Sequence, residues 1–131
     1  MGPRRPRPLT LDTGALVAFE RGDERVRATI KLALASGVDL GIPAGVVAQA
    51  WRDGRRQARL NVLLSHRGAR IEDLDGRTAR AVGALCARAG TADIVDASVV
   101  LCARRQGDAI VLTSDAPDLL ALDPTLRCLG V

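Results

Sequence analysis

Five short apolar runs alternate with longer stretches of helical periodicity along the whole chain. The runs are predicted as strands over residues 9–11, 38–42, 69–74, 109–113 and 126–129. Helices are predicted over residues 13–21, 23–36, 43–54, 55–65, 76–89, 93–106 and 115–122. Strands that alternate with helices build a parallel sheet covered by helices on both faces. The sequence therefore predicts the α/β class, as a three-layer α/β/α domain with a central, mostly parallel sheet.

The chain has the size and composition of one domain with an aliphatic core. It has 131 residues, of which 47% are hydrophobic, and Phe19 and Trp51 are its only aromatic residues. A length in this range is typical of a single domain. Residues 1–8 hold three prolines and three arginines, a composition that cannot bury apolar surface. We therefore expect a flexible basic arm at residues 1–8 and a single domain at residues 9–131.

The charge balance favours a polyanionic partner. The formal net charge is +4, and because Lys31 is the only lysine, nearly all positive charge is carried by arginine. The planar guanidinium group donates several hydrogen bonds in a geometry that fits phosphate oxygens. Aromatic residues are too scarce to form a surface that binds RNA by base stacking. A nucleic acid held through its backbone is the partner that this composition favours.

Cysteine usage and hydropathy disfavour several other classes of protein. Cys86, Cys102 and Cys128 are widely spaced and lack the spacing of zinc ligands, and His66 is the only histidine. We expect buried thiols in a reducing cytosol. Asp12 interrupts the apolar stretch that a signal peptide would need, and no uncharged run is long enough to span a bilayer. We therefore expect a cytoplasmic protein with no membrane association.

The aspartates are placed where functional residues of α/β proteins gather. Asp12 ends the first predicted strand, and Asp115 follows the fourth. Asp93 and Asp96 lie one helical turn apart at the start of a predicted helix, so both can face the same direction. If the first and fourth strands are neighbours, these carboxylates converge at the carboxyl edge of the sheet, the usual place for a site.

Carboxylates held close together repel one another and take up protons. A divalent cation removes this conflict, and a site made only of oxygen ligands favours Mg²⁺ or Mn²⁺. Such an ion can polarise a phosphodiester and lower the pKa of a bound water. An acidic metal site on a basic protein is suited to phosphodiester hydrolysis, with arginines binding the nucleic acid backbone.

Helix capping is the alternative explanation of the same aspartates. Asp12, Asp93 and Asp115 each precede a predicted helix, where aspartate is a favoured N-cap. Asp96 and Asp118 stand three residues after a cap position, where a carboxylate can close a capping box or interact with the helix dipole. The sequence alone leaves both explanations open.

Four segments of the chain resemble the motifs of VapC-type toxins of the PIN-domain family. They are LDTGAL at 11–16, PAGVVAQAWR at 43–52, DIVDA at 93–97 and TSDAPDL at 113–119. They occur in the order and at the spacing of that family, and the resemblance covers the chain from Leu9 to its end. It implies an endoribonuclease that uses Mg²⁺ or Mn²⁺ and cleaves cellular RNA (tRNA, rRNA or mRNA). It also implies a homodimer and a VapB-like antitoxin of a type II toxin–antitoxin system that blocks the site.

The resemblance also implies roles for particular residues. Asp12 matches the first acid of the family, Asp96 the third and Asp115 the fourth, and these three are the expected metal ligands. Asp93 is an expected further catalytic acid, and Asp118 a possible accessory acid near the same site.

The second acid of the family is missing from this sequence. PIN domains commonly have a glutamate in the helix after the second strand, where this chain has Gln49. An amide oxygen can coordinate a hard cation, but it carries no charge and cannot take a proton. Gln49 is therefore expected as a neutral fourth side chain of the catalytic site. Glu20 or Asp53 could instead supply a carboxylate from a nearby helix.

Gln49 keeps a second interpretation open, a degenerate PIN domain that binds RNA or an antitoxin without cleaving. A third interpretation is a haloacid-dehalogenase-like phosphohydrolase, which also has an aspartate after its first strand. That class has a second aspartate two residues on, where this chain has Gly14.

An arginine cluster follows the Gln49 helix. It consists of Arg52, Arg55, Arg56 and Arg59. The cluster could bind RNA phosphates or form an ordinary solvated helix face, and the sequence does not decide between these roles.

Overall fold

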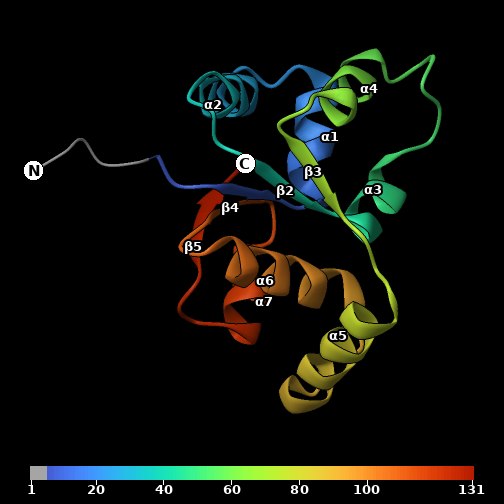
Figure 1. Cartoon of the computed structure of the whole chain (residues 1–131), viewed down its shortest axis with the longest axis vertical. Coiled ribbons are helices and arrows are strands. Elements are labelled where there is room, and N and C mark those ends of the chain that lie inside the picture. Colours follow the sequence, from blue (N-terminus) through green and yellow to red (C-terminus); the bar gives the residue numbers. More distant parts are fainter. Residues whose placement is uncertain (1–5) are drawn as a thin grey trace, which may run out of the picture.

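The computed structural model describes residues 6–131 and contains one five-stranded sheet in which every strand pair is parallel (Figure 1). The strands lie in the order β3-β2-β1-β4-β5. Their bounds are Leu9–Leu11 for β1, Leu40–Pro43 for β2, Ala69–Glu72 for β3, Ile110–Thr113 for β4 and Arg127–Gly130 for β5. The first and fourth strands are neighbours, with Leu11 opposite Leu112. The prediction of a parallel sheet is confirmed.

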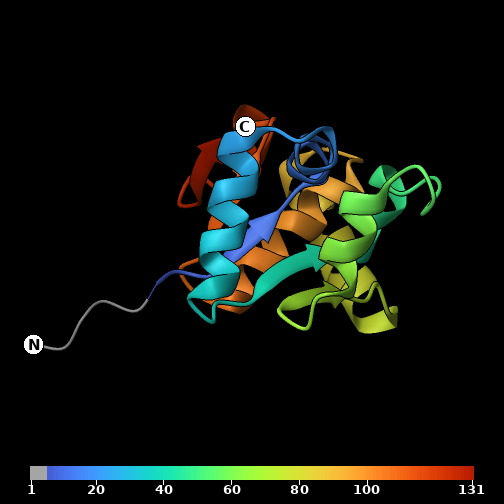
Figure 2. The same ribbon diagram turned by 90° about the horizontal axis from the view of Figure 1, so that it is seen from above.

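Helices cover both faces of this sheet. Their bounds are Thr13–Arg21 for α1, Glu24–Ala35 for α2, Ala44–Ala50 for α3, Ala58–Ser65 for α4, Gly76–Ala89 for α5, Ile94–Gln106 for α6 and Ala116–Leu122 for α7. Figures 1 and 2 show α1, α2 and α4 on one face of the sheet, and α6 and α7 on the other. Helix α5 packs on α6 and α7 rather than on the sheet. The prediction of a three-layer α/β/α domain is confirmed.

The core is aliphatic, and α6 is its most buried helix. The four residues from Ala97 to Val100 are all buried, and so are Cys102 and Ala103. A helix this apolar around its circumference belongs in an interior. It packs closely on β2: Gly41 leaves no room for a side chain there, since an added Cβ atom would lie only 2.8 Å from the Cys102 sulfur. This packing fixes where α6 begins and so places the aspartates of its first turn.

The predicted helix over residues 43–54 is wrong at both ends. Pro43 is the last residue of β2, and α3 ends at Ala50, because Trp51 has an extended backbone. The next helix begins at Ala58 rather than at residue 55. Residues 51–57 instead form a loop in which the Gln57 side chain accepts hydrogen bonds from the backbone. A side chain therefore replaces the hydrogen bonds that a continuous helix would have made. The other predicted elements are present, with ends shifted by at most two residues.

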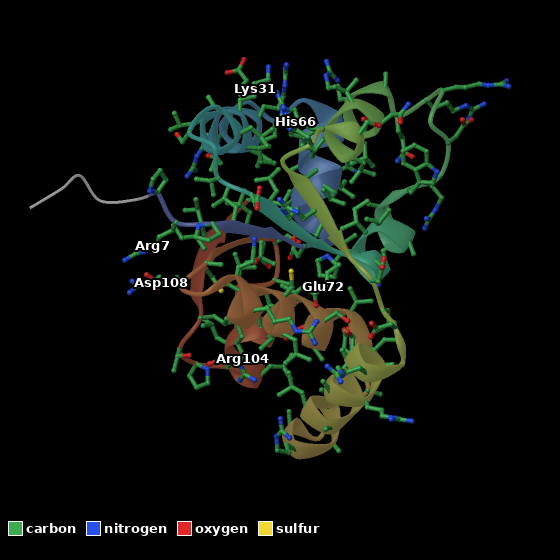
Figure 3. The ribbon with its side chains drawn as sticks, in the orientation of Figure 1. Arg7, Lys31, His66, Glu72, Arg104 and Asp108 are labelled. Carbon is green, nitrogen blue, oxygen red and sulfur yellow. The ribbon has the colours of Figure 1, made fainter. Side chains whose placement is uncertain are left out.

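The segment predicted as a basic arm, residues 1–8, is described only from Pro6 onward, and residues 1–5 lie outside the described residues. The carbonyl oxygen of Pro8 accepts a hydrogen bond from the Ile110 N–H at 2.9 Å. Arg7 pairs with Asp108 at 3.0 Å (Figure 3). Asp108 also pairs with Arg127 at 2.8 Å, so this carboxylate links the start of β1 to the start of β5.

Two of the three thiols are buried, as expected from the composition, whereas Cys128 is only half-buried. Cys86, Cys102 and Cys128 are free, and the first two are buried. Among the helices of residues 6–131, none combines the length and the apolar character needed to cross a membrane.

Candidate metal centre at the carboxyl edge of the sheet

Asp12 joins two elements that are about a hundred residues apart in the chain. It follows β1 directly, and its N–H donates to the carbonyl oxygen of Leu112 at 3.1 Å, which continues the pairing with β4. One carboxylate oxygen accepts from the N–H of Ala15 at 2.9 Å and so caps α1. The other accepts from the N–H of Ser114 at 3.3 Å. The buried carboxylate therefore holds the start of α1 against the turn that follows β4.

Gly14 allows this close approach. A Cβ atom at this position would lie 2.0 Å from the Ser114 hydroxyl oxygen, far inside van der Waals contact. Any side chain here would therefore push α1 away from the turn after β4. Because residue 14 has no side chain, Asp115, the N-cap residue of α7, can lie close to the first turn of α1.

Three carboxylates converge beside Asp12. Asp96 lies in the first turn of α6, Asp115 at the N-cap position of α7 and Asp118 in the first turn of α7. Each offers an oxygen, and these oxygens lie within 4.8 Å of one another. Asp115 makes no side-chain capping bond in its own helix. Capping therefore does not explain why an aspartate stands at position 115.

Burial and the neighbouring carboxylates raise the pKa of Asp96 and of Asp115. Burial, followed by the charges of Asp93, Asp115 and Asp118, raises the pKa of Asp96 to about 7. The pKa of Asp115 is also raised, first by its hydrogen bond to Asp118, then by burial and by the neighbouring charges, including that of Asp12. Without a cation, the cluster relieves its repulsion by keeping protons.

The donor set fits a hard divalent cation. All its side chains are carboxylates, and Mg²⁺ and Mn²⁺ prefer oxygen ligands. Asp96, Asp115 and Asp118 can hold such an ion. Asp12, which was also predicted as a ligand, lies outside this group of three, and its carboxylate bonds to Ser114, the residue before Asp115. A bound cation would also remove the repulsion that raises the pKa of Asp96.

The two other predicted site residues, Asp93 and Gln49, lie outside the group of three carboxylates. Asp93 caps α6 by accepting from the N–H of Asp96 at 3.0 Å, and it lines a cavity of about 210 Å³ together with Asp96 and Asp118. Gln49 is exposed, and its amide oxygen accepts from the Thr13 hydroxyl at 2.5 Å. It therefore lies beside the residue that follows Asp12.

The structure assigns Asp118 a larger part than the sequence did. It was expected only as an accessory acid, yet it belongs to the closest group of three carboxylates. The spacing of three residues from Asp115 within one helix was the signal for this proximity.

The two alternative carboxylates serve the α4 region instead. Glu20 accepts from the N–H of Leu60 at 2.7 Å, in the first turn of α4. Asp53 accepts from the N–H of Arg55 at 2.9 Å. Neither belongs to the group of oxygens described above.

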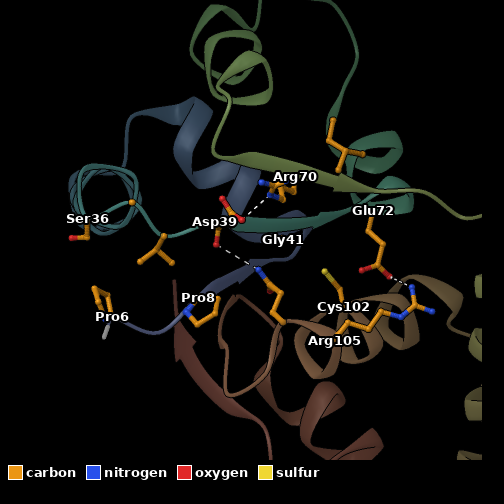
Figure 4. A pocket seen from close by; sticks show the side chains of 13 residues that line it. Pro6, Pro8, Ser36, Asp39, Gly41, Arg70, Glu72, Cys102 and Arg105 are labelled. Atoms are coloured by element: carbon orange, nitrogen blue, oxygen red, sulfur yellow. Dashed lines mark hydrogen bonds and ion pairs between the residues drawn. The ribbon is translucent and has the colours of Figure 1, made fainter. Parts of the chain in front are cut away.

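A larger cavity lies elsewhere, and its charged groups are already paired (Figure 4). It has a volume of about 500 Å³ and lies near the amino ends of β1 and β2, between β3 and the last turns of α6. Arg70 pairs with Asp39 at 2.7 Å, and Arg105 pairs with Glu72 at 2.8 Å. A large pocket is the usual first candidate for a site. Here the unpaired charges lie at the other edge of the sheet, so we place the chemistry there.

Comparisons with known proteins agree with this geometry. The family model described as the PIN domain matches residues 9–117. The chain therefore belongs to the PIN-domain family, and the haloacid-dehalogenase-like interpretation is set aside. No curated protein matches the sequence.

Three solved structures share the fold. VapBC2 from Rickettsia felis, bound to a DNA fragment from its promoter, has a TM-score of 0.64 at 16% identity and covers 94% of this chain and 98% of that chain. FitAB bound to an IR36 DNA fragment has a TM-score of 0.64 at 18% identity, with coverages of 93% and 94%. FitAcB from Neisseria gonorrhoeae has a TM-score of 0.58 at 19% identity, with coverages of 92% and 96%. At these identities, the likeness shows a shared fold.

The raised pKa of Asp96 predicts how the stability of the metal-free protein depends on pH. The pKa of an aspartate in an unfolded chain is about 3.9, whereas the pKa of folded Asp96 is about 7. Between these values the folded state binds more protons than the unfolded state. The contribution of Asp96 to the free energy of unfolding therefore falls as the pH rises through this window.

Asp96→Asn imitates the protonated side chain and should remove this contribution. In EDTA, the wild-type melting temperature should fall more between about pH 4.5 and about pH 7.5 than that of Asp96→Asn. Adding Mg²⁺ at the higher pH should stabilise the wild type and have less effect on the variant. The same pH dependence in both proteins would contradict the cause given for the pKa of Asp96.

Proposed function

We propose that this protein is a metal-dependent endoribonuclease, the toxin of a type II toxin–antitoxin pair. Its substrate is cellular RNA (tRNA, rRNA or mRNA), and a cognate VapB-like antitoxin inhibits it. The observation that carries the proposal is the convergence of the Asp96, Asp115 and Asp118 carboxylates beside buried Asp12. The chain's membership of the PIN-domain family supports it, since PIN domains are generally nucleases.

Each acid contributes to the proposed reaction from a fixed position. Asp96, Asp115 and Asp118 would hold Mg²⁺ or Mn²⁺ between them. Asp12, which matches the first acid of the family, would be a further ligand beside the Ser114 turn. A cation held there would supply Lewis-acid chemistry, polarising the phosphodiester and making water a better nucleophile. Asp93 orients Asp96 by accepting its backbone N–H. The Asp12 carboxylate bonds to the first turn of α1 and to the turn before α7, and so holds the N-termini of these two helices together. This contact preserves the spacing of the ligands.

Asp118 is the basis for proposing an active enzyme despite Gln49. A glutamate at position 49 would add a negative charge to a site where Asp96 already has a pKa of about 7. Asp118 offers an oxygen within 4.8 Å of oxygens of Asp96 and Asp115. A carboxylate from α7 therefore takes the place of the glutamate that is missing at position 49. Gln49 then contributes a neutral side chain that is held by Thr13.

The proposed partners and cellular location are those that membership of the PIN-domain family suggests. The solved structures of this fold include VapBC2 and FitAB complexes, each bound to DNA, which supports an antitoxin as the partner of this chain. A homodimer in the cytoplasm is the proposed working form.

Substitution of the clustered acids tests the enzyme directly. Asp96→Asn and Asp115→Asn should each lower the rate of Mn²⁺-dependent RNA cleavage by roughly a hundredfold or more, because each removes a ligand charge. Titration calorimetry should show weaker Mn²⁺ binding to both variants. Asp39→Asn is the matched control, since it removes an exposed carboxylate near the amino ends of the strands. Cleavage by Asp96→Asn at the wild-type rate would show that these acids do not carry the activity.

The degenerate alternative makes a different prediction for position 49. If Asp118 supplies the fourth carboxylate, Gln49→Glu should change Mn²⁺ affinity and the cleavage rate by less than about tenfold. A degenerate site would instead gain strongly in both properties when the missing acid is restored. Cleavage assays and metal titrations of the two proteins side by side distinguish these outcomes. A gain well above tenfold would mean that the natural chain is impaired as an enzyme and acts by binding.

A further inference from the structure

The loop over residues 51–57 has a built internal structure. Gln57 organises it through both atoms of its carboxamide group. The amide oxygen accepts from the backbone N–H groups of Arg52 at 2.7 Å and Asp53 at 3.0 Å, and the nitrogen donates to the carbonyl oxygen of Ala50 at 2.8 Å. One side chain therefore closes the end of α3 and shapes the turn that follows it.

Further contacts hold the tip of this loop. The Asp53 carboxylate accepts from the N–H of Arg55 at 2.9 Å, and the Asp53 carbonyl oxygen accepts from the N–H of Arg56 at 3.1 Å. Half-buried Trp51 packs under Gly54, where an added Cβ atom would lie 3.1 Å from the ring. A loop that is held in this way loses little conformational entropy when it binds a ligand.

The four arginines around the loop divide into two pairs. Arg52 donates to the carbonyl oxygens of Ala48 and Trp51, and Arg59 donates to the carbonyl oxygen of Glu20. These two guanidinium groups close the ends of α3 and α1. The side chains of exposed Arg55 and Arg56 make no hydrogen bond or ion pair with other residues of the range 6–131. Their charges face solvent at the tip of a shaped loop.

Helix α3 connects the loop with the segment that follows Asp12. Gln49, two residues before the loop, accepts a hydrogen bond from Thr13, which follows Asp12 in the chain. Figures 1 and 2 show the loop between α3 and α4 projecting on the side opposite β5, and Figure 1 shows β2 and β3 pointing toward that side. The cluster of acids repels an RNA backbone wherever no cation lies between them. Arg55 and Arg56, on a loop that α3 links to the site, would supply the attraction that this backbone needs.

We propose that residues 51–57 form a phosphate clamp for the backbone of the RNA substrate. Arg55 and Arg56 bind the phosphates, and Gln57 is a positioning residue that holds the loop in its binding shape. The proposal rests on the proposed ribonuclease function. It adds that the bound RNA runs from the acidic cluster across α3 to the 51–57 loop.

Binding of a single-stranded RNA in EDTA tests the clamp apart from cleavage. Arg55→Ala/Arg56→Ala should weaken binding and lower the slope of log affinity against log salt by about 1.4, since each phosphate contact on a single strand contributes about 0.7. The matched control is Lys31→Ala/Arg67→Ala, which removes two exposed positive charges, one from α2 (Lys31, Figure 3) and one from the α4–β3 turn. The control should keep the wild-type affinity and slope.

Two further variants distinguish a shaped clamp from charge alone. Arg55→Lys/Arg56→Lys should keep the salt slope but bind less tightly, because lysine lacks the planar fork of donors. Gln57→Leu keeps every charge and should weaken binding with an unchanged slope, because the loop loses its internal hydrogen bonds. Thermal melts show whether each variant remains folded. Loss of affinity in Gln57→Leu without unfolding supports the positioning role, and wild-type affinity contradicts it.

The clamp and the ribonuclease function can fail separately. If Arg55→Ala/Arg56→Ala binds RNA as the wild type does, or if the control double variant loses as much, the clamp is wrong. Loss of cleavage in Asp96→Asn would still support the enzyme in that case. If the arginine variants weaken binding as expected while Asp96→Asn cleaves normally, the clamp stands and the proposed metal site fails.

Discussion

The parallel pairing of β1 with β4 determines where the acids of this protein meet. Because Leu11 lies opposite Leu112, β1 and β4 end within one residue of each other, and Asp12 and the Ser114 turn leave the sheet side by side. The Asp12 carboxylate then bonds to both following segments, at Ala15 and at Ser114. Gly14 leaves the space for this contact. The position of Asp115 beside the first turn of α1 follows from these few interactions.

The same geometry creates an electrostatic repulsion among the carboxylates, which either bound protons or a bound cation can relieve. Burial and like charge raise the pKa of Asp96 to about 7, so the metal-free site keeps protons at the cost of its ligand charge. A hard cation would remove the conflict, and the positive charges of the 51–57 loop would attract the phosphate backbone that the acids repel. In this account, an acidic centre and a basic loop on α3 act together on one polyanion.

Much of this arrangement could be predicted from the sequence, because periodicity and strand order are local or nearly local signals. The alternation of strands and helices predicted the parallel sheet, and the position of Asp12 and Asp115 after their strands predicted that they would be close. The 51–57 loop was missed because its hydrogen bonds come from the Gln57 side chain, which no periodicity records. The proximity of Asp118 depends on the orientation of α7, and the structural use of Arg52 and Arg59 depends on carbonyl groups at helix ends. Such relations appear only in three dimensions.

The central claim is that Asp96, Asp115 and Asp118 hold one hard cation. Anomalous diffraction from a crystal of the wild-type protein soaked in Mn²⁺ tests it most directly. The account predicts a single strong peak at coordination distance, about 2 Å, from oxygens of at least two of these three carboxylates. A peak held by other residues, or none at this edge of the sheet in a crystal that retains the fold, would contradict it.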